Sequence, residues 1–135
     1  MSAFVLDDAK RLLMIRRTDS GPHALPGCRH ELGETMTQTL IREVLEETGI
    51  TVEATGLIGI YSNPAHVIAF SDGEVRQESS TCFSARPIGG TARTSEESTE
   101  VRWGERDQLG DLDVHPSIRL RIEHGFADRP EPYYT

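Results

Sequence analysis

The chain has 135 residues, with 22 Asp or Glu against 14 Lys or Arg and a formal net charge of -8. This length predicts a single domain, 1–135, with one hydrophobic core. The acidic balance argues against a broad nucleic-acid-binding surface, which would need clustered lysines and arginines, but not against a nucleotide whose phosphates a metal neutralises.

The cysteines and the N-terminus predict a cytoplasmic protein. Cys28 and Cys82 form no spacing pattern of a disulfide or a metal site, so we expect both to be reduced thiols. Residues 1–8 have no basic region and too short an apolar run for a signal peptide. No stretch approaches the length of a membrane span, so we expect no membrane partner.

Short strands are expected ahead of one well-marked helix. Residues 3–6 and 12–17 flank a polar turn at 7–10, which predicts a hairpin. Thr35 and Gln38 have the spacing of a capping box, and Gly49 is a typical helix stop. These signals predict a helix over 36–48.

Downstream, alternating strands and turns lead to a second helix. A strand over 51–61 is expected to break at Ser62-Asn63-Pro64. Asp72-Gly73 is a two-residue hairpin signal that joins 67–71 to a strand beginning at Glu74. Further strands are expected over 79–86 and 100–103, and a helix should open at His115-Pro116-Ser117 and end its regular part near Gly125.

The first helix carries an acidic cluster. Glu43, Glu46 and Glu47 lie at helical offsets that place them on one face. The opposite, mostly apolar face is expected to hold Thr37, Ile41, Val44, Leu45 and Thr48. Carboxylates ~6 Å apart repel by roughly 3 kcal/mol per pair at an effective dielectric of ~20. Such a cluster favours Mg²⁺, Mn²⁺ or Ca²⁺ as a bound ion. Taken alone, residues 42–47 are explained equally well by a solvated acidic surface.

The longer spacing resembles the Nudix box, which reads Gly, five residues, Glu, seven residues, Arg-Glu, an aliphatic, any residue, Glu-Glu, any residue, Gly, an aliphatic. The match covers residues 28–50 through Glu34, Arg42, Glu43, Val44, Glu46, Glu47, Gly49 and Ile50. Cys28 stands where the family has the first glycine, directly after Gly27. Two interpretations of this departure stay open: it is tolerated, or it weakens catalysis.

The resemblance implies a fold and an activity. The fold is the Nudix α/β/α sandwich, in which a mixed β-sheet lies between a central motif helix and a C-terminal helix. The activity is divalent-metal-dependent pyrophosphohydrolysis, in which water attacks phosphorus in a nucleoside diphosphate linked to another moiety. The expected cofactor is Mg²⁺, with Mn²⁺ possible, and the expected partner is a small nucleotide. Dimers are frequent in the family, so a homodimer is possible.

The resemblance also implies residue roles. The metal ligands would be Glu43, Glu46 and Glu47, helped by the backbone carbonyl of Gly27 or Cys28. Arg42 would pair with Glu34 and brace the loop against the helix. The general base would be a box glutamate, Glu46 or Glu47, or would come from a later loop at Glu97 or Glu96, which could equally be an exposed acidic loop.

Substrate-binding candidates are Arg17, His23 and Asn63. Arg17 is preferred to Arg16 because strand alternation sends only one of them inward, although a surface ion pair explains either. Pro64, next to Asn63, resembles a proline of the ADP-ribose pyrophosphatase branch, although a turn proline explains the same residue without any substrate. The expected substrate is a (d)NTP or an ADP-ribose-like nucleotide. The alternative function is a non-hydrolysing nucleotide-sensing module with a degenerate box.

Overall fold

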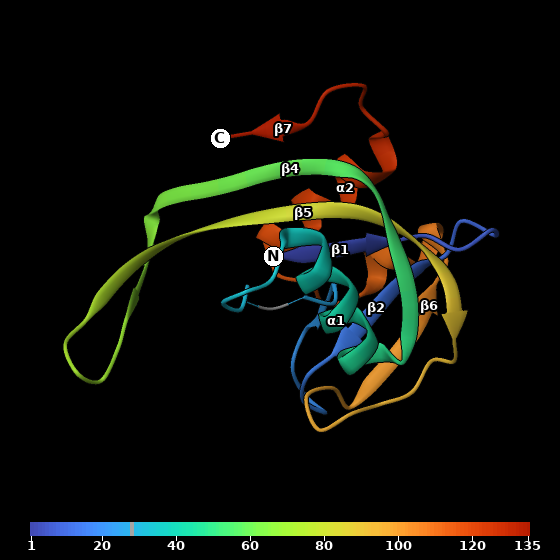
Figure 1. Cartoon of the computed structure of the whole chain (residues 1–135), viewed down its shortest axis with the longest axis horizontal. Coiled ribbons are helices and arrows are strands. Elements are labelled where there is room, and N and C mark those ends of the chain that lie inside the picture. Colours follow the sequence, from blue (N-terminus) through green and yellow to red (C-terminus); the bar gives the residue numbers. More distant parts are fainter. Residues whose placement is uncertain (28) are drawn as a thin grey trace.

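A computed structural model describes residues 1–27 and 29–135, except for the side chain of residue 66. The strands form two sheets (Figure 1). The larger sheet has the order β1 (Ser2–Val5), β5 (Val75–Gly90), β4 (Ile50–Ala69) and β7 (Tyr133–Tyr134). The smaller has the order β3 (His23–Ala24), β2 (Leu12–Arg16) and β6 (Glu100–Gly104).

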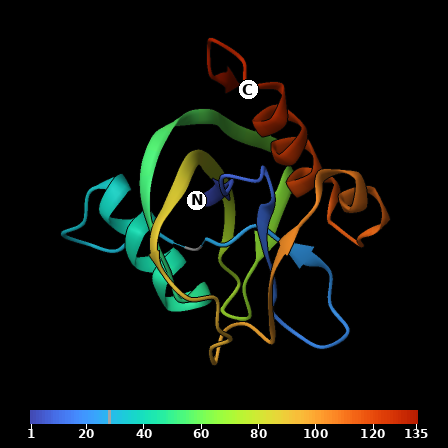
Figure 2. The same cartoon turned by 90° about the vertical axis from the view of Figure 1, so that its right-hand side faces the viewer.

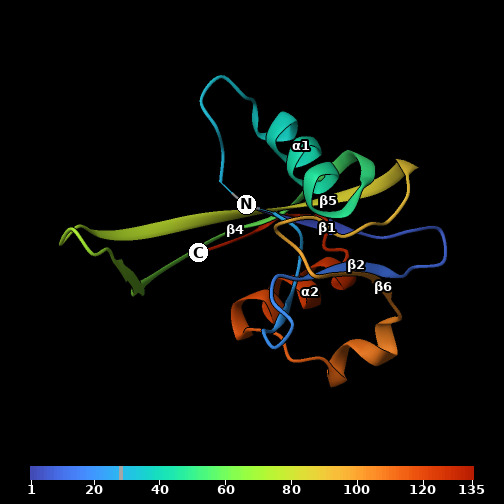
Figure 3. The same cartoon turned by 90° about the horizontal axis from the view of Figure 1, so that it is seen from below.

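The sheets lie between helices. Helix α1 (Met36–Thr48) is on one side, and α2 (Pro116–Ala127) with the short 3-10 helix η1 (Arg106–Asp111) is on the other (Figure 3). In the larger sheet, β5 runs parallel to β1 and antiparallel to β4. This confirms the expected α/β/α sandwich with a mixed sheet. No helix in the part of the chain that the structure describes is long and apolar enough to cross a membrane.

Two hydrophobic clusters hold the layers together. Strand β1 is buried on both faces, so Ala3 and Val5 contact the cluster beneath α1 while Phe4 contacts the cluster beneath α2. Figure 2 shows the curved β4 and β5 wrapping around these inner strands. Strands covered on both faces are expected to be continuously apolar, as β1 and β2 are.

Helix α1 has the predicted bounds because both of its ends are capped locally. The Thr35 hydroxyl accepts from the Gln38 N–H at 3.2 Å, and the Gln38 side chain accepts from the Thr35 N–H at 2.9 Å. Gly49 closes the helix at φ 78°, donating its N–H to the carbonyl of Leu45 at 2.9 Å. A side chain at Gly49 would also overlap the Thr91 carbonyl oxygen.

The faces of α1 differ from the expectation. Its buried residues are Thr39, Leu40, Glu43, Val44, Glu47 and Thr48. Ile41 and Leu45, expected on the apolar side, are exposed. The inward face therefore combines apolar residues with two of the three clustered glutamates, which turns those carboxylates toward the body of the protein.

The expected hairpin between 3–6 and 12–17 forms only at its turn, where the Asp7 N–H donates to the Arg11 carbonyl at 3.1 Å and the Lys10 N–H to the Asp7 carbonyl at 3.0 Å. Strands β1 and β2 belong to different sheets and are joined by an isolated bridge between Leu6 and Leu12. Each strand is apolar on both faces and is buried by its own neighbours, so pairing between them is not needed to cover either one.

The expected end of a strand before Ser62 and the expected end of the regular helix near Gly125 are wrong. Strand β4 continues through Ser62-Asn63-Pro64, and the irregularity is absorbed as a register shift between Ser62 and Val67. A bulge of this kind admits proline at a sheet edge.

Gly125 lies inside α2, which ends only at Ala127 with Asp128 in the left-handed conformation at φ 48°. Gly125 is required there because a Cβ would overlap the ring of Phe4.

We expect Gly49→Ala to be more destabilising than Gly33→Ala. Both glycines have positive φ, 78° and 86°, but an added Cβ at Gly33 has nothing within 4 Å. The control should therefore lose only the conformational cost of ~1–2 kcal/mol, whereas Gly49→Ala adds overlap and should lose ~3 kcal/mol or more. Urea unfolding of both variants measures the difference, and equal losses would contradict the role of the close contact.

Candidate active site

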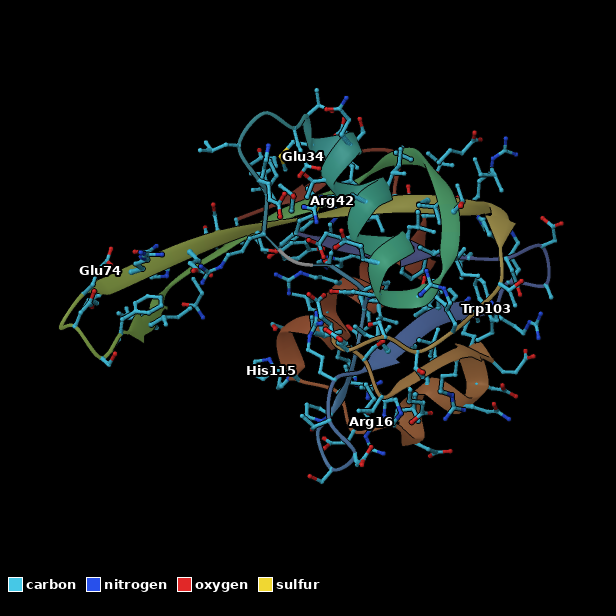
Figure 4. The ribbon with its side chains drawn as sticks, turned by 60° about the horizontal axis from the view of Figure 1, so that its bottom comes forward. Arg16, Glu34, Arg42, Glu74, Trp103 and His115 are labelled. Carbon is cyan, nitrogen blue, oxygen red and sulfur yellow. The ribbon has the colours of Figure 1, made fainter. Side chains whose placement is uncertain are left out.

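An ion-pair network fixes the loop that precedes α1. The guanidinium of Arg42 binds the Glu34 carboxylate through two hydrogen bonds, from Nε to Oε2 at 2.8 Å and from Nη2 to Oε1 at 2.9 Å. The Thr39 hydroxyl donates to the same carboxylate at 3.0 Å. Figure 4 shows Glu34 in the loop and Arg42 on the helix that follows. This places Arg42 in the bracing position that the sequence predicts.

These bonds favour the ionised forms of both partners. The hydrogen bond from Arg42 lowers the pKa of Glu34 from 4.5 to about 2. The pKa of Arg42 is raised, with the Glu34 hydrogen bond as the largest cause. Arg42 also binds Glu43 Oε1 at 2.7 Å and Glu46 Oε2 at 3.2 Å through Nη1. One guanidinium therefore connects the loop with the acidic face of α1.

Three carboxylates converge beside α1. Glu43 and Glu47 are one turn apart on the helix, and Glu97 comes from the loop between β5 and β6. One oxygen from each lies within 4.8 Å of the others. Burial raises the pKa of both Glu43 and Glu47. Among the described residues, the buried Oε2 of Glu43 has no hydrogen-bond partner.

Such a donor set fits a divalent cation. Hard ions such as Mg²⁺, Mn²⁺ and Ca²⁺ prefer carboxylate and carbonyl oxygens, and a bound cation would satisfy the orphaned oxygen and offset the mutual repulsion. The sequence offers Glu97 as a candidate general base and not as a metal ligand, and the structure brings its carboxylate to the cluster.

The loop that carries Glu97 is tied to the end of α1. The hydroxyl of Ser98 donates to the backbone carbonyl of Glu47 at 2.7 Å, and the Arg93 N–H donates to the carbonyl of Thr48 at 2.8 Å. Ser98 is buried and was not singled out from the sequence. Its contact spans 51 residues, and a lone serine in a polar loop offers no pattern that would reveal it.

Glu47 is fully buried, with 0% of its surface exposed, and is held by two groups from the approach to the box. The Gly27 N–H donates to its Oε2 at 3.0 Å. Arg17 donates from Nη1 to Glu47 Oε1 at 3.2 Å and from Nη2 to the Gly27 carbonyl at 2.8 Å. Arg17 thus contacts two of the groups that the family pattern assigns to metal.

Glycine is required at position 27. Its φ is 151°, and a Cβ there would overlap the Met1 carbonyl oxygen and the Ser2 Cα. The backbone at Met1 and Ser2 therefore comes closest to the loop at Gly27, the residue just before the position where the box has its glycine. Cys28, the position of the departure from the box and an expected carbonyl ligand, lies outside the described residues.

Three other candidates lie apart from the carboxylate group. Glu46 is exposed and paired with Arg42. His23 is only 8% exposed, and its Nε2 is 3.3 Å from Glu100 Oε2. Asn63 is exposed, and its side-chain oxygen accepts from the Ala65 N–H at 2.9 Å within the bulge of β4. Their expected ligand and substrate roles stay predictions. Glu96, the other loop option for the base, is exposed and outside the group.

The comparisons with known proteins identify the class. A NUDIX domain matches residues 1–124, so the chain belongs to the Nudix family. A MutT-like protein of Streptomyces ambofaciens is 40% identical over 111 residues, covering 82% of this chain and 66% of the relative. An ADP-ribose pyrophosphatase of Methanocaldococcus jannaschii is 29% identical over 116 residues, covering 80% and 62%. The chain thus spans just under two thirds of the length of these relatives.

A third relative, the 8-oxo-dGDP phosphatase NUDT18 of Mus musculus, is 33% identical over 114 residues, covering 79% of this chain and 32% of the relative. The fold matches the solved MutT protein from Bacillus halodurans with a TM-score of 0.75 and 25% identity, over 98% of this chain and 84% of that one. A UDP-X diphosphatase has a TM-score of 0.74 at 18% identity, over 99% and 64%, which shows the fold alone.

We expect Glu34→Gln to reduce stability at neutral pH and to have no effect in acid. The pKa of Glu34 is lowered on folding, so its carboxylate stabilises the protein above pH 4.5, and this contribution is lost as the pH falls toward about 2. The difference in free energy of unfolding between wild type and variant should therefore be largest near pH 7 and vanish near pH 2.

Glu31→Gln is the matched control for this titration. Glu31 is exposed and lies 3.7 Å from Arg42 in a looser contact. Its removal should change stability far less at every pH, since exposed pairs contribute little. A pH-independent loss in Glu34→Gln would mean that the side chain acts through packing and not through its charge.

Proposed function

We propose that this protein is a divalent-metal-dependent pyrophosphohydrolase that cleaves a nucleoside diphosphate linked to another moiety by water attack on phosphorus. The observation that carries the proposal is the convergence of Glu43, Glu47 and Glu97 on one point, with an unsatisfied buried oxygen at Glu43. A merely structural acidic surface would spread its carboxylates into solvent, where repulsion is screened.

The metal would be held by Glu43, Glu47 and Glu97, with the Gly27 or Cys28 carbonyl and Glu46 completing the set. Glu46 reaches the group only if its exposed side chain leaves Arg42. We propose Mg²⁺, with Mn²⁺ as a substitute, because all the donors are oxygens. When bound, the ion would neutralise phosphate charge and lower the pKa of the attacking water.

The chain's own residues have separate tasks. Glu97 is exposed whereas Glu43 and Glu47 are buried, so one oxygen of Glu97 would hold the metal while the other accepts a proton from the attacking water as general base. Arg42 orients Glu43 through its hydrogen bond at 2.7 Å. Arg17 keeps 46% of its side chain exposed, which lets its guanidinium bind a substrate phosphate close to the carboxylates.

The substrate class is a (d)NTP or an ADP-ribose-like nucleotide. The names of the relatives support both, since one is an ADP-ribose pyrophosphatase and another, 30% identical over 103 residues, is the nucleoside triphosphatase NudI of an Enterobacter species. A panel of nucleoside triphosphates, 8-oxo-dGTP, 8-oxo-dGDP and ADP-ribose, each with Mg²⁺ or Mn²⁺, separates them by the release of monophosphate, pyrophosphate or phosphate. We propose no nucleic-acid substrate, given the net charge of -8.

Metal binding should depend on the converging carboxylates and not on general acidity. We expect Glu43→Gln and Glu97→Gln to weaken Mn²⁺ binding by about tenfold or more, because each removes a charged ligand. Glu96→Gln is the control, since Glu96 neighbours Glu97 in sequence but is outside the group. Calorimetric titration with MnCl₂ measures the affinities; equal weakening by Glu96→Gln would show that the ion responds only to net charge.

Glu47→Gln separates catalysis from nucleotide binding. The substitution keeps the shape of the side chain and can still accept from the Gly27 N–H, but it removes one charge from the metal site. Turnover should fall by orders of magnitude. Stability at pH 7 should stay the same or rise slightly, because burial raises the pKa of Glu47 and the neutral amide avoids that penalty. Nucleotide binding should be less affected than turnover.

The controls for this variant are wild type and Glu96→Gln, which should both turn over substrate. Parallel measurements are product release, nucleotide binding by calorimetry and thermal unfolding. If wild type binds a nucleotide tightly but hydrolyses none of the panel with either metal, the hydrolase proposal is wrong, and a nucleotide-sensing module takes its place.

A further inference from the structure

A two-stranded ribbon projects from the body of the protein (Figure 1). It consists of residues 62–69 of β4 and 75–81 of β5, joined by the turn around Gly73, and Glu74 marks its far end in Figure 4. The pairing of β7 with β4 stops at Ile60, and the pairing of β1 with β5 starts at Cys82. In the described part of the chain, the ribbon strands pair only with each other.

An isolated two-stranded ribbon is marginally stable, and its free edges can accept another strand. The two edges of this ribbon differ. The β4 edge carries Pro64 and the register shift between Ser62 and Val67, both of which oppose pairing. The β5 edge over Glu74–Ser80 has no proline, and its pairing with β4 is regular from Val75 to Gln77. Only the β5 edge is therefore suited to accept a strand.

The sequence of this edge is complementary to itself in the antiparallel direction. It reads Glu74-Val75-Arg76-Gln77-Glu78-Ser79-Ser80. When two copies are paired about a two-fold axis at Gln77, Arg76 of each copy lies opposite Glu78 of the other, and Val75 lies opposite Ser79. Opposite charges at directly paired positions are stabilising, and a two-fold axis makes each such pair twice.

We propose that the β5 edge of the ribbon pairs with the same edge of a second copy, giving an antiparallel homodimer centred on Gln77. Neighbouring registers are disfavoured by the same charges. Centring on Arg76 or on Glu78 puts like charges directly opposite each other, and centring between residues gives no Arg–Glu pair. Centring on Val75 also gives two Arg–Glu pairs, between Arg76 and Glu74, but it reaches the turn at Gly73 after one residue on either side of the axis. The Gln77 register gives the longer paired segment with both ion pairs and no like-charge contact.

The pairing also has the room that it needs. In this register Glu74 of one copy lies opposite Ser80 of the other, two residues short of Cys82, where β1 occupies the edge. The paired segment of each ribbon therefore ends before the part of the partner's β5 that pairs with β1. Arg76 binds Glu74 of its own chain through Nε and Nη2 at 2.9 and 3.0 Å, and its Nη1 takes no part in that pair. Glu78 accepts from Arg29 of its own chain through Oε1 at 3.4 Å, and its Oε2 takes no part in that exposed contact.

Both faces of the ribbon carry side chains with exposed apolar surface. Val67 and Val75 are 50% and 62% exposed. The register pairs Val67 with Gln77 and Ala69 with Val75, so all four residues share one face. On the other face, the Arg76 guanidinium lies 4.6 Å from the centre of the Phe70 ring. Edge pairing places Val75 of each copy directly opposite Ser79 of the other, so part of its exposed apolar surface is buried along the new strand pair.

Charge reversal tests the register. Sedimentation velocity of the full chain over a concentration series should show a dimer. Arg76→Glu and Glu78→Arg should each raise the dimer dissociation constant at least about tenfold, because two attractive pairs become repulsive. The double variant R76E/E78R should restore the dimer, since opposite charges face each other again while the internal contact of Arg76 with Glu74 stays lost.

A cysteine scan tests the two-fold position independently. Gln77→Cys should form an interchain disulfide on mild oxidation with oxidised glutathione, because a residue on the axis faces its own copy within disulfide range. Ser79→Cys, on the same face and also exposed, should cross-link no more than wild type, which gives the background from Cys28 and Cys82. A monomer at every concentration, or a dimer unaffected by the charge reversals, overturns the proposal.

Discussion

The buried carboxylate of Glu47 connects segments that are far apart in the chain. It accepts from the Gly27 backbone and from Arg17, and the backbone carbonyl of the same residue accepts from Ser98. The approach to the box, the end of α1 and the loop that carries Glu97 thus meet at one side chain. A buried charge without such partners would be strongly unfavourable, so these contacts must form together with the fold.

The inward face of α1 carries charged residues beside the apolar Leu40 and Val44. Its charged residues Glu43 and Glu47 face the body, while Ile41 and Leu45 are exposed. Burial raises the pKa of both glutamates, which means that the folded protein holds them as carboxylates at a cost in stability. Arg42 and Arg17 offset part of that cost. Strain of this kind is expected where a site is organised for a ligand and not for stability alone.

The parts of this structure that could be predicted are those determined by neighbouring residues. Thr35, Gln38 and Gly49 act within a few positions of one another, so the bounds of α1 follow from the sequence. The spacing from Glu34 to Gly49 identified the family and with it the sandwich. The assignment of β1 and β2 to different sheets could not be predicted, because it depends on parallel pairing with β5 some 80 residues later. The anchoring of the Glu97 loop through Ser98 also depends on a long-range contact, which spans 51 residues.

Gly125 shows how one missing side chain acts across the molecule. It leaves a notch in α2 that the ring of Phe4 fills, and the neighbouring Phe126 meets the same ring edge-on at 5.1 Å. This contact fixes the position of α2 along β1, because a shift of α2 by one residue would place a larger side chain against the Phe4 ring. The Ala3 N–H of the same strand donates to the Pro26 carbonyl at 2.8 Å. The contact between Gly125 and Phe4 therefore also helps to position the backbone at Gly27, which binds Glu47.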